Sequence, residues 1–350
     1  MSRRRRQPAL FCFMLCSIFA MLFFLLPACS SNRPQTYQKS RALMDTFITI
    51  TVAAGSGKEA DNALETAFAV IEGFGKRIDF FSGDSELSRI NSNAGIAGIR
   101  VSADTFDLIE KALYVADRSG GAFDPTIGPV VRLWDFHKKT RPSDTDIKRG
   151  LALVGYKQVV LDKQRSTVFL KKKGMLLDLG GIAKGYAADL AAESLKAGGI
   201  ASGIVAIAGD IRAFGLRPDG TPWNIGIKNP RQERAGDEII GSIRLSNRAV
   251  STAGDYERYF IEDGRRYHHI LDPSTGYPAG QCRSVSIITE KGVFTDGFDN
   301  AVFVLGPQKG MQLIREINRD FEMDGIIIDA DGSVSETDRI KGTIKNEKSH

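Results

Sequence analysis

Three side chains that carry oxygen stand within about one helical turn of each other late in the sequence. Asp296, Asp299 and Asn300 precede the apolar run 301–306, and residues three or four apart share one face of a helix. Carboxylate and amide oxygens suit Mg²⁺, which prefers hard oxygen ligands. The alternative is an N-cap with solvent-facing polar neighbours, a common arrangement. Because such caps are common, this segment taken alone favours the second interpretation.

A second segment could hold an anion. The pattern over 175–179 predicts a buried strand, Gly180-Gly181 predicts a tight turn, and 182–195 predicts a helix. A strand, a glycine turn and a helix N-terminus together present backbone N–H groups to an anion. Lys184 adds a positive charge in the first helical turn. A plain glycine turn beneath a packed helix is the alternative, and this segment alone does not decide between them.

Two of the four histidines are adjacent, His268 and His269. An imidazole titrates near neutral pH and can serve as a general base. If the stretch is extended, the two rings point to opposite faces, so they are not equivalent. A structural role for either histidine is the alternative. Other segments rich in glycine, proline or aspartate, at 120–129, 209–210 and 254–256, follow or interrupt regular elements.

The elements that must position these residues alternate between strands and helices. Helices are predicted over 58–78, 102–119 (capped by Ser102), 144–154, 292–305 and 307–318, and a polar loop with about one helical turn over 82–93. Strands are predicted over 45–52, 157–160, 167–170, 203–210, 223–229, 241–246, 283–289 and 325–328. The pattern predicts an α+β fold in one compact domain with mixed or antiparallel sheets.

Composition separates the N-terminus from the rest of the chain. The 350 residues are 42% hydrophobic and 25% charged, which excludes wholesale disorder. The net charge of +5 depends on Arg3–Arg6, since the other 43 basic residues nearly balance 42 acidic ones. The chain is therefore not basic enough to indicate a nucleic-acid partner.

The N-terminal segment predicts export. Arginines 3–6 precede the apolar stretch 9–26, which ends in Leu26-Pro27-Ala28-Cys29. This order is typical of a lipoprotein signal peptide with Cys29 as the lipidated residue, and an uncleaved anchor helix is the alternative. We expect the body to be lipid-anchored to the cell membrane, facing the periplasm or the cell exterior. Cys282 is then the one cysteine left in the body, so no intrachain disulfide is expected.

Several long segments, in their order along the chain, resemble the ApbE family of FAD:protein FMN transferases. They run from Met44-Asp45-Thr46 to about Gly306 and comprise SELSRIN (85–91), GAFDPTIGP (121–129), DLGGIAKGYAAD (178–189), AGD (208–210), STAGDYERYF (251–260), HILDPSTGYP (269–278) and DGFDNAVFVLG (296–306). The resemblance implies a T-shaped domain over 43–340. A signal peptide over 1–28, a lipidated Cys29 with a linker to residue 42, and a polar tail over 341–350 complete the predicted organisation.

The resemblance also implies an activity. The family binds FAD and, with Mg²⁺, transfers the FMN half to a Thr or Ser hydroxyl of a target flavoprotein, with release of AMP. The target carries a motif close to Asp-x-x-Ser/Thr-Gly-Ala-Ser/Thr. Subunits of the sodium-pumping quinone reductase and of the related Rnf complexes are the usual targets.

Carried over residue by residue, the resemblance implies three groups of site residues. The cofactor-binding positions are Met44, Phe81, Ala122, Phe123, Asp124, Thr126, Asp178, Lys184 and Leu271. The metal positions are the carbonyl of Gly181, Asp296, Asp299 and Asn300, where Asn300 replaces the commoner Thr and Asp299 replaces a small residue. His269 is the expected general base, with His268 as the alternative.

Two other functions use the same groove. A metal-dependent FAD pyrophosphatase would let water replace the Ser or Thr hydroxyl. A flavin-binding lipoprotein without turnover would need no metal. The bulky apolar Phe81 resembles the residue of transferase members of the family more than that of hydrolytic ones, which favours transfer. The Asp296/Asn300 pair argues against mere binding.

Overall fold

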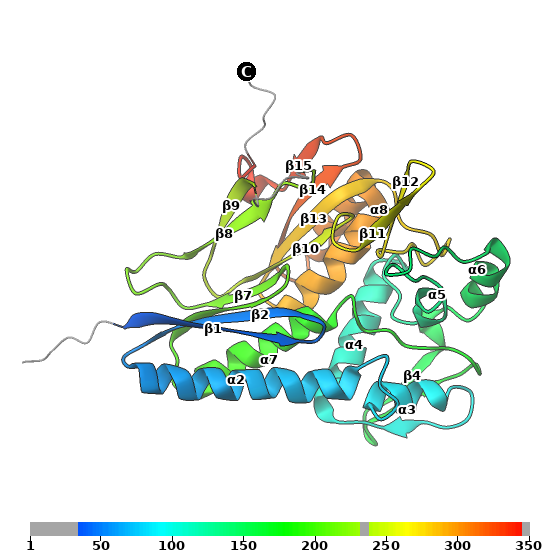
Figure 1. Ribbon diagram of the computed structural model, residues 1–350, viewed down its shortest axis with the longest axis horizontal. Coiled ribbons are helices and arrows are strands. Elements are labelled where there is room, and N and C mark those ends of the chain that lie inside the picture. Colours follow the sequence, from blue (N-terminus) through cyan, green and yellow to red (C-terminus); the bar gives the residue numbers. More distant parts are fainter. Residues whose placement is uncertain (1–33, 232–237, 345–350) are drawn as a thin grey trace, which may run out of the picture. The chain divides into compact units, whose positions relative to one another are not determined.

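The computed structural model describes residues 34–231 and 238–344, in which strands and helices alternate (Figure 1). Its strands are β1 (Gln35–Leu43), β2 (Thr46–Ala54), β3 (Ile99–Arg100), β4 (Val159–Asp162), β5 (Thr167–Leu170), β6 (Ser202–Ile207), β7 (Asp210–Phe214), β8 (Trp223–Lys228), β9 (Ile239–Leu245), β10 (Ala249–Gly254), β11 (Tyr259–Glu262), β12 (Arg265–His268), β13 (Cys282–Thr289), β14 (Met323–Asp329) and β15 (Val334–Glu336). Its α-helices are α2 (Gly57–Ile78), α3 (Glu86–Ser92), α4 (Ala103–Arg118), α5 (Gly128–Val131), α6 (Asp144–Leu151), α7 (Ala183–Ala197) and α8 (Gly292–Ile317). The predicted α+β class is confirmed.

One eight-stranded sheet organises these elements. Its order is β1-β2-β6-β7-β10-β13-β14-β15, and all neighbours are antiparallel. Strands β6 and β7 meet at a two-residue turn, with Ile207 paired to Asp210 and Ala208 in the left-handed region at φ 51°. This turn places Asp210 at the first position of β7.

Three long helices cover one face of the sheet. Helix α2 packs on β1 and β2, α7 on β6 and β7, and α8 on β10, β13 and β14. Because successive strand residues point to opposite faces, Ile287 of β13 lies in the core beneath the helices while Ile288 lies in a second core. The β8–β9 hairpin covers that second core with Trp223 and Leu245.

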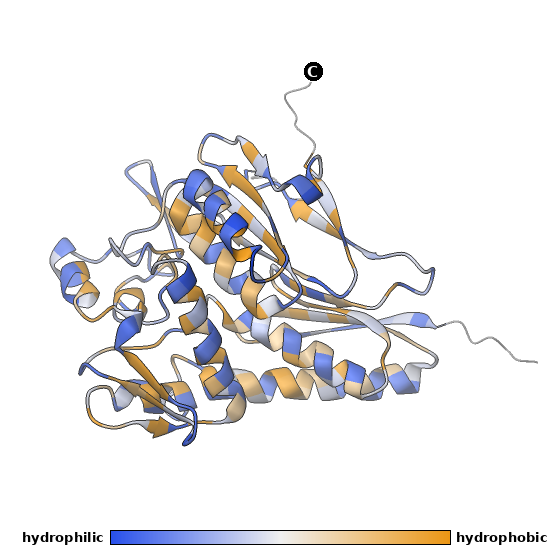
Figure 2. Ribbon diagram, turned by 180° about the vertical axis from the view of Figure 1, so that it is seen from behind, coloured by the Kyte–Doolittle hydropathy of each residue, from blue (hydrophilic) through white to orange (hydrophobic). Residues whose placement is uncertain are grey.

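A third apolar cluster lies around the short helices and the β11–β12 hairpin. Val130, Trp134, Ile147, Tyr267 and Leu271 belong to it. Figure 2 shows hydrophobic residues along the sheet strands and on the inner parts of the helices. Among the residues described, no helix combines the length and the apolar character needed to cross a membrane.

Several local predictions are confirmed. Ser102 caps α4, because its hydroxyl accepts from the Thr105 N–H. The two helices predicted to meet near residue 306 form α8, which is kinked where Gly306 adopts φ 77° before Pro307. The strands predicted over 157–160 and 167–170 correspond to β4 and β5, which pair antiparallel with Val159 opposite Leu170.

The strand predicted over 175–179 is wrong. The segment is extended, but only Leu176 forms a bridge, to Ile127. The Asn91 side chain takes the place of a neighbouring strand: its amide donates to the Leu177 carbonyl at 2.9 Å and accepts from the Leu177 N–H at 2.7 Å. Asp178 N–H donates to the Pro125 carbonyl at 2.8 Å. Side-chain and loop partners therefore satisfy the backbone hydrogen bonds of this segment, although its apolar sequence pattern resembles that of a strand.

Three boundaries also differ from those predicted. The segment predicted as a linker up to residue 42 contains β1, which pairs with β2 along its whole length. The predicted polar tail begins too early, since Ile344 is buried in the second core and pairs with Gly241. The polar loop predicted over 82–93, with about one helical turn, contains a longer helix, the seven-residue α3, whose Leu87 and Ile90 are buried. The polar composition of these three segments does not indicate their structure, because each segment packs only a few apolar side chains. The predicted signal peptide and Cys29 lie outside the described residues.

Candidate functional site

Helices α7 and α8 cross in backbone contact, and this crossing builds the site. A methyl group on Gly185 would lie 2.0 Å from the Gly292 carbonyl oxygen, so the crossing leaves no room for a side chain at this position. Asp189, one turn further along α7, accepts from the Gly292 and Val293 N–H groups at 2.8 and 2.9 Å. These bonds cap α8, whose own N-cap residue supplies no side-chain bond. The start of α7 is therefore held against the first turns of α8.

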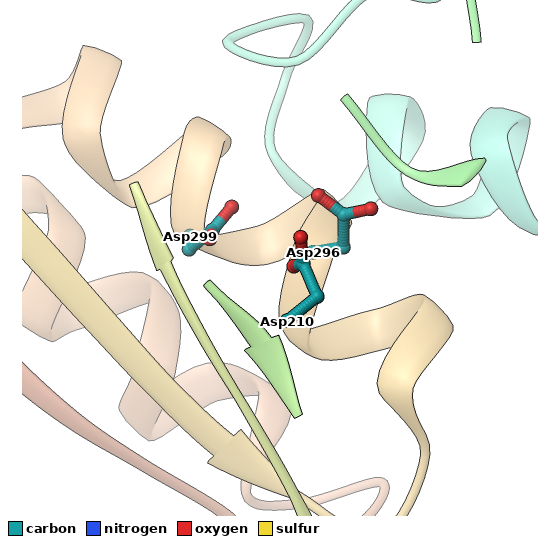
Figure 3. Close-up of side chains that lie close together, drawn as sticks. All are labelled: Asp210, Asp296 and Asp299. Carbon is teal, nitrogen blue, oxygen red and sulfur yellow. The ribbon is translucent and has the colours of Figure 1, made fainter. Parts of the chain in front are cut away.

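The crossing brings together three buried carboxylates. Asp296 and Asp299 lie on α8 and Asp210 at the start of β7, and Figure 3 shows the three side chains close together. One oxygen from each of the three lies within 4.8 Å of the others. Asp296 accepts from the Gly185 N–H at 2.9 Å, and the Lys184 ammonium bonds to Asp210 and lies 3.2 Å from Asp296 Oδ1.

The charges of this group do not balance. Three carboxylates and one ammonium leave two negative charges in a buried place. Burial, with the neighbouring Asp210 charge, raises the pKa of Asp296 to about 6. Burial and the charges of Asp296 and Asp210 raise the pKa of Asp299 well above its usual range. Burial alone would lower the pKa of Lys184, but Asp210 and Asp296 outweigh it and the pKa lies above its ordinary value. One divalent cation would restore neutrality.

Asn300 joins the glycine turn to this group. Its Nδ2 donates to the Asp296 carbonyl and to Asp299 Oδ1, both at 2.9 Å, and lies 3.3 Å from the Gly181 carbonyl. A half-turn of the amide exchanges its nitrogen and oxygen, so the same side chain can offer Oδ1 to a cation. The four predicted metal positions, Gly181, Asp296, Asp299 and Asn300, therefore lie together, and their oxygen donors fit Mg²⁺.

The two histidines differ in their surroundings. His268 is buried, its Nε2 bonds to the Ala279 carbonyl at 2.7 Å, and its Nδ1 accepts from the Ile270 N–H at 3.3 Å. Both of its ring nitrogens are thus used within the fold. His269 Nδ1 is also buried but has no hydrogen-bond partner among the described residues. Burial, then the positive neighbours His268, Arg258 and Lys184, lowers the pKa of His269 to about 3.

Two of the predicted cofactor residues stabilise a loop. Asp124 accepts from the Thr126 N–H at 2.8 Å and from the Tyr156 N–H at 3.0 Å, and Thr126 Oγ1 accepts from the Gly155 N–H at 2.7 Å. The neighbouring Phe123 ring would lie 3.3 Å from a methyl group on Gly181, so this loop borders the glycine turn. Ala122 is half-buried beside it.

The other predicted cofactor residues lie on separate elements. Asp178 Oδ1 accepts from the Gly180 N–H at 2.8 Å, next to the glycine turn. Met44 occupies the β1–β2 turn at φ 52° and faces Gly75 of α2. Phe81, which is 81% exposed, follows the end of α2, and Leu271 belongs to the third apolar cluster. Met44, Phe81 and Leu271 thus lie outside β7 and α8, the elements that carry the carboxylate group.

Asp210 is the member of the carboxylate group to which sequence analysis assigns no role. The available signal is its place directly after the apolar strand 203–207 and the turn Ala208-Gly209. The role of this position depends on the antiparallel pairing of β6 with β7, because the turn between them places Asp210 at the α7–α8 crossing.

Adding a methyl group at the crossing is expected to separate the two helices. We predict that Gly185→Ala lowers the free energy of unfolding by about 3 kcal/mol, because overpacking outweighs the better helix propensity of alanine. Urea denaturation measures this change. Gly83→Ala is the control, since a methyl group there meets nothing within 4 Å. A G185A variant as stable as the unmodified chain would contradict the close crossing.

Comparison with known proteins places the chain in a family. The ApbE family model matches residues 44–323. An FAD:protein FMN transferase of Treponema pallidum (strain Nichols) is 35% identical over 301 residues, which cover 81% of this chain and 83% of the relative. One of Klebsiella pneumoniae (strain 342) is 34% identical over 291 residues, covering 82% and 87%.

Solved structures agree with the sequence relatives. The crystal structure of the ApbE protein of Thermotoga maritima has a TM-score of 0.80 and 34% identity, covering 89% of this chain and all of that one. The flavin transferase ApbE of Vibrio cholerae has a TM-score of 0.77 and 28% identity with the same coverage. With a family model and relatives matching most of its length, the chain belongs to the ApbE family.

Proposed function

We propose that this chain is an enzyme that transfers the FMN moiety of FAD to a Thr or Ser hydroxyl of a target flavoprotein. The hydroxyl oxygen attacks the FMN-side phosphorus, the bond from that phosphorus to the bridging oxygen breaks, and AMP leaves with that oxygen. The hydroxyl proton passes to a base. The observation that carries the proposal is the buried oxygen cluster at the α7–α8 crossing of an ApbE family member, because phosphoryl transfer depends mainly on positioning and charge neutralisation.

The metal part of the proposal rests on the donor set. Asp296, Asp299, Asn300 and the Gly181 carbonyl would hold one Mg²⁺, which suits hard oxygen ligands and removes the two surplus negative charges. When bound, Mg²⁺ would supply charge neutralisation for the diphosphate. Lys184 has three N–H donors, of which two face Asp210 and Asp296. We propose that the third donates to a phosphate oxygen of the substrate.

His269 is the proposed base. Its unpartnered Nδ1 can accept a proton, and its lowered pKa keeps the ring neutral at physiological pH. Its positive neighbour Lys184 also bonds to the carboxylate group, which links the two parts of the site. His268 Nε2 donates to the Ala279 carbonyl, so His268 could accept a proton only at Nδ1 and would have to give up the bond from the Ile270 N–H.

The FAD-binding part of the proposal involves three regions around this centre. Phe123 and Asp178 border the glycine turn. Ala122, Asp124 and Thr126 belong to the adjoining loop. Met44, Phe81 and Leu271 would extend the groove, and the exposure of Phe81 leaves its ring free to contact a flavin.

One experiment tests the proposed function and its two alternatives. The chain is incubated with FAD, Mg²⁺ and a protein that carries the Asp-x-x-Ser/Thr-Gly-Ala-Ser/Thr motif, and covalent flavin is read by in-gel fluorescence beside AMP release. Fluorescent target and an equal amount of AMP support transfer. Free FMN and AMP without labelled target indicate a pyrophosphatase, and FAD binding without AMP indicates a flavin-binding protein. Quinone reductase and Rnf-type subunits are the proposed natural targets.

The proposed location is a lipid-anchored position on the outer side of the cell membrane. It rests on the arginines, the apolar stretch and the Leu26-Pro27-Ala28-Cys29 sequence. We predict that Cys29→Ala abolishes lipid labelling and blocks cleavage by lipoprotein processing. Labelling with a radioactive fatty acid and mass spectrometry of the mature N-terminus measure both effects. Cys282→Ala is the control, since this buried cysteine lies in the body. A mature chain that begins elsewhere and carries no lipid would contradict the prediction.

A further inference from the structure

We propose that Asp210 is a positioning residue that holds Lys184 as a built-in counter-ion and does not itself ligate the metal. This inference rests on the metal site in the proposed function and goes beyond it. It assigns the third carboxylate of the group to the lysine, and it leaves Asp296 and Asp299 to the divalent ion.

The hydrogen bonds support this division. The Asp210 carboxylate is only 5% exposed and bonds to the Lys184 ammonium. Across residues 34–231 and 238–344, no other group donates a hydrogen bond to it. Asp296 has a second donor, the Gly185 N–H at 2.9 Å, and Asp299 accepts from Asn300 at 2.9 Å. Asp210 therefore depends on Lys184 for its one charged bond.

The position of Asp210 is fixed by the backbone. It starts β7 directly after the two-residue turn in which Ala208 has φ 51°. Lys184, in contrast, carries its charge on a flexible four-carbon side chain. An anchored carboxylate that pairs with a flexible ammonium sets where the ammonium lies. Without Asp210, the ammonium would have only Asp296 and Asp299 as anionic partners within this group, and these are the oxygens proposed for the metal.

Charge counting gives the expected signs. With all three carboxylates ionised, the group carries a net charge of −2. Asp210→Asn changes it to −1 and releases the ammonium toward the metal oxygens, so metal affinity should fall. Lys184→Met changes the charge to −3, so affinity should rise. The double variant D210N/K184M replaces a neutral pair by two neutral side chains and returns the charge to −2.

The size of these effects can be bounded. Even with the dielectric constant of water, one unit charge about 5 Å from a divalent ion changes its affinity by about tenfold. We therefore expect D210N to weaken metal binding by about tenfold or more and K184M to tighten it by about tenfold. The double variant should lie within about threefold of the unmodified chain.

The measurement uses Mn²⁺ as the probe. The full-length chain without FAD or target protein is titrated with Mn²⁺, and free Mn²⁺ is followed by electron paramagnetic resonance. Asp324→Asn is the matched control, because Asp324 is also buried and ion-paired, but with Arg248 and Arg339. It should bind Mn²⁺ like the unmodified chain. Thermal unfolding of every variant shows whether it is folded.

Each outcome decides the inference. If Asp210 is a metal ligand, D210N/K184M will lack that ligand at an unchanged net charge and will bind Mn²⁺ at least about tenfold more weakly than the unmodified chain, which overturns the proposal. If the pair is only structural, K184M will not tighten Mn²⁺ binding, which overturns it even if D210N fails to fold. If the variants show the expected Mn²⁺ affinities but the unmodified chain transfers no FMN, the proposed function is refuted and this inference stands. An unmodified chain that binds no Mn²⁺ would refute both the metal site and this inference.

Discussion

Replacing Asp296 with alanine is expected to remove most Mg²⁺-dependent FMN transfer, with a loss on the order of 10²-fold or more. The carboxylate is buried, belongs to the oxygen cluster and lies 3.2 Å from the Lys184 ammonium. Its removal takes away one of two proposed anionic ligands and a partner of Lys184. The measurement is the initial rate of target labelling as a function of Mg²⁺ concentration. At limiting Mg²⁺ the loss should be largest, because a weakened site is then least occupied.

The Asp296→Asn variant separates the effect of the lost negative charge from the effect of a disturbed fold. Asparagine keeps an oxygen that can accept from the Gly185 N–H, so the α7–α8 crossing is retained while the negative charge is lost. We expect D296N to lose transfer nearly as strongly as D296A but to unfold at a temperature closer to that of the unmodified chain. Asp324→Asn again serves as the control for loss of a buried, ion-paired carboxylate. Unchanged turnover of D296A at limiting Mg²⁺ would place the metal elsewhere.

Features set by neighbours in the sequence are predictable from the sequence alone. The Ser102 cap, the kink of α8 at Gly306-Pro307 and the shared face of Asp296 and Asn300 each depend on residues within one turn. Helical periodicity fixes such relations before any tertiary contact forms. The candidate metal residues on α8 were therefore available from spacing, and the resemblance to a family supplied their role.

Features set by distant residues are not predictable in this way. Asn91 bonds to Leu177, 86 positions away, and this contact makes an apolar segment extended without a strand partner. Lys184 meets Asp296 across 112 positions because glycines at the helix crossing allow backbone contact. Asp210 joins them only through the pairing of β6 with β7. The pattern of one segment contains no information about which carboxylate another segment will bring to it.

The difference between the two histidines also needed the structure. Their alternation in an extended strand predicts opposite faces, but not which face holds the reactive ring. The structure gives His268 two bonds within the fold and leaves His269 Nδ1 without a partner among the described residues. It also adds Lys184 and Arg258 as positive neighbours of His269. These contacts favour His269 over His268 as the proposed base.

Replacing His269 with alanine is expected to lower FMN transfer by about 10²- to 10⁴-fold while FAD binding stays nearly intact. This is the usual cost of removing a general base. The measurements are the single-turnover rate of target labelling and the FAD dissociation constant. A residue that only packs the groove would instead weaken FAD binding and lower stability together. Unchanged transfer in H269A would mean that phosphate positioning and the metal suffice without a histidine base.

The pH dependence follows from the lowered pKa of His269. With a pKa of about 3 in the folded chain, the ring stays neutral and able to accept a proton well below pH 6. Protonation of His269 should therefore not reduce the transfer rate near pH 6.5, the ordinary pKa of histidine. As the pH is lowered, the unmodified chain should show no decrease centred there that is absent from H269A.

The same lowered pKa affects stability. Unfolded His269 binds a proton near pH 6.5 and folded His269 does not, so its contribution to stability is full above pH 6.5 and is lost as the pH falls toward 3. Without FAD or metal, the free energy of unfolding should fall less in H269A than in the unmodified chain when the pH is lowered from 7.5 to 5.

His268→Ala is the matched control, because it removes the same ring from the adjacent position. His268 bonds to the Ala279 carbonyl at 2.7 Å and packs edge-on against Phe303, so H268A leaves a cavity and an unpaired carbonyl. We expect it to lower the free energy of unfolding by about 2–3 kcal/mol and to change the transfer rate of the folded fraction far less than H269A. A large rate loss in H268A beside an active H269A would reverse the assignment. The two variants thus separate a ring that holds the fold from a ring that accepts the proton.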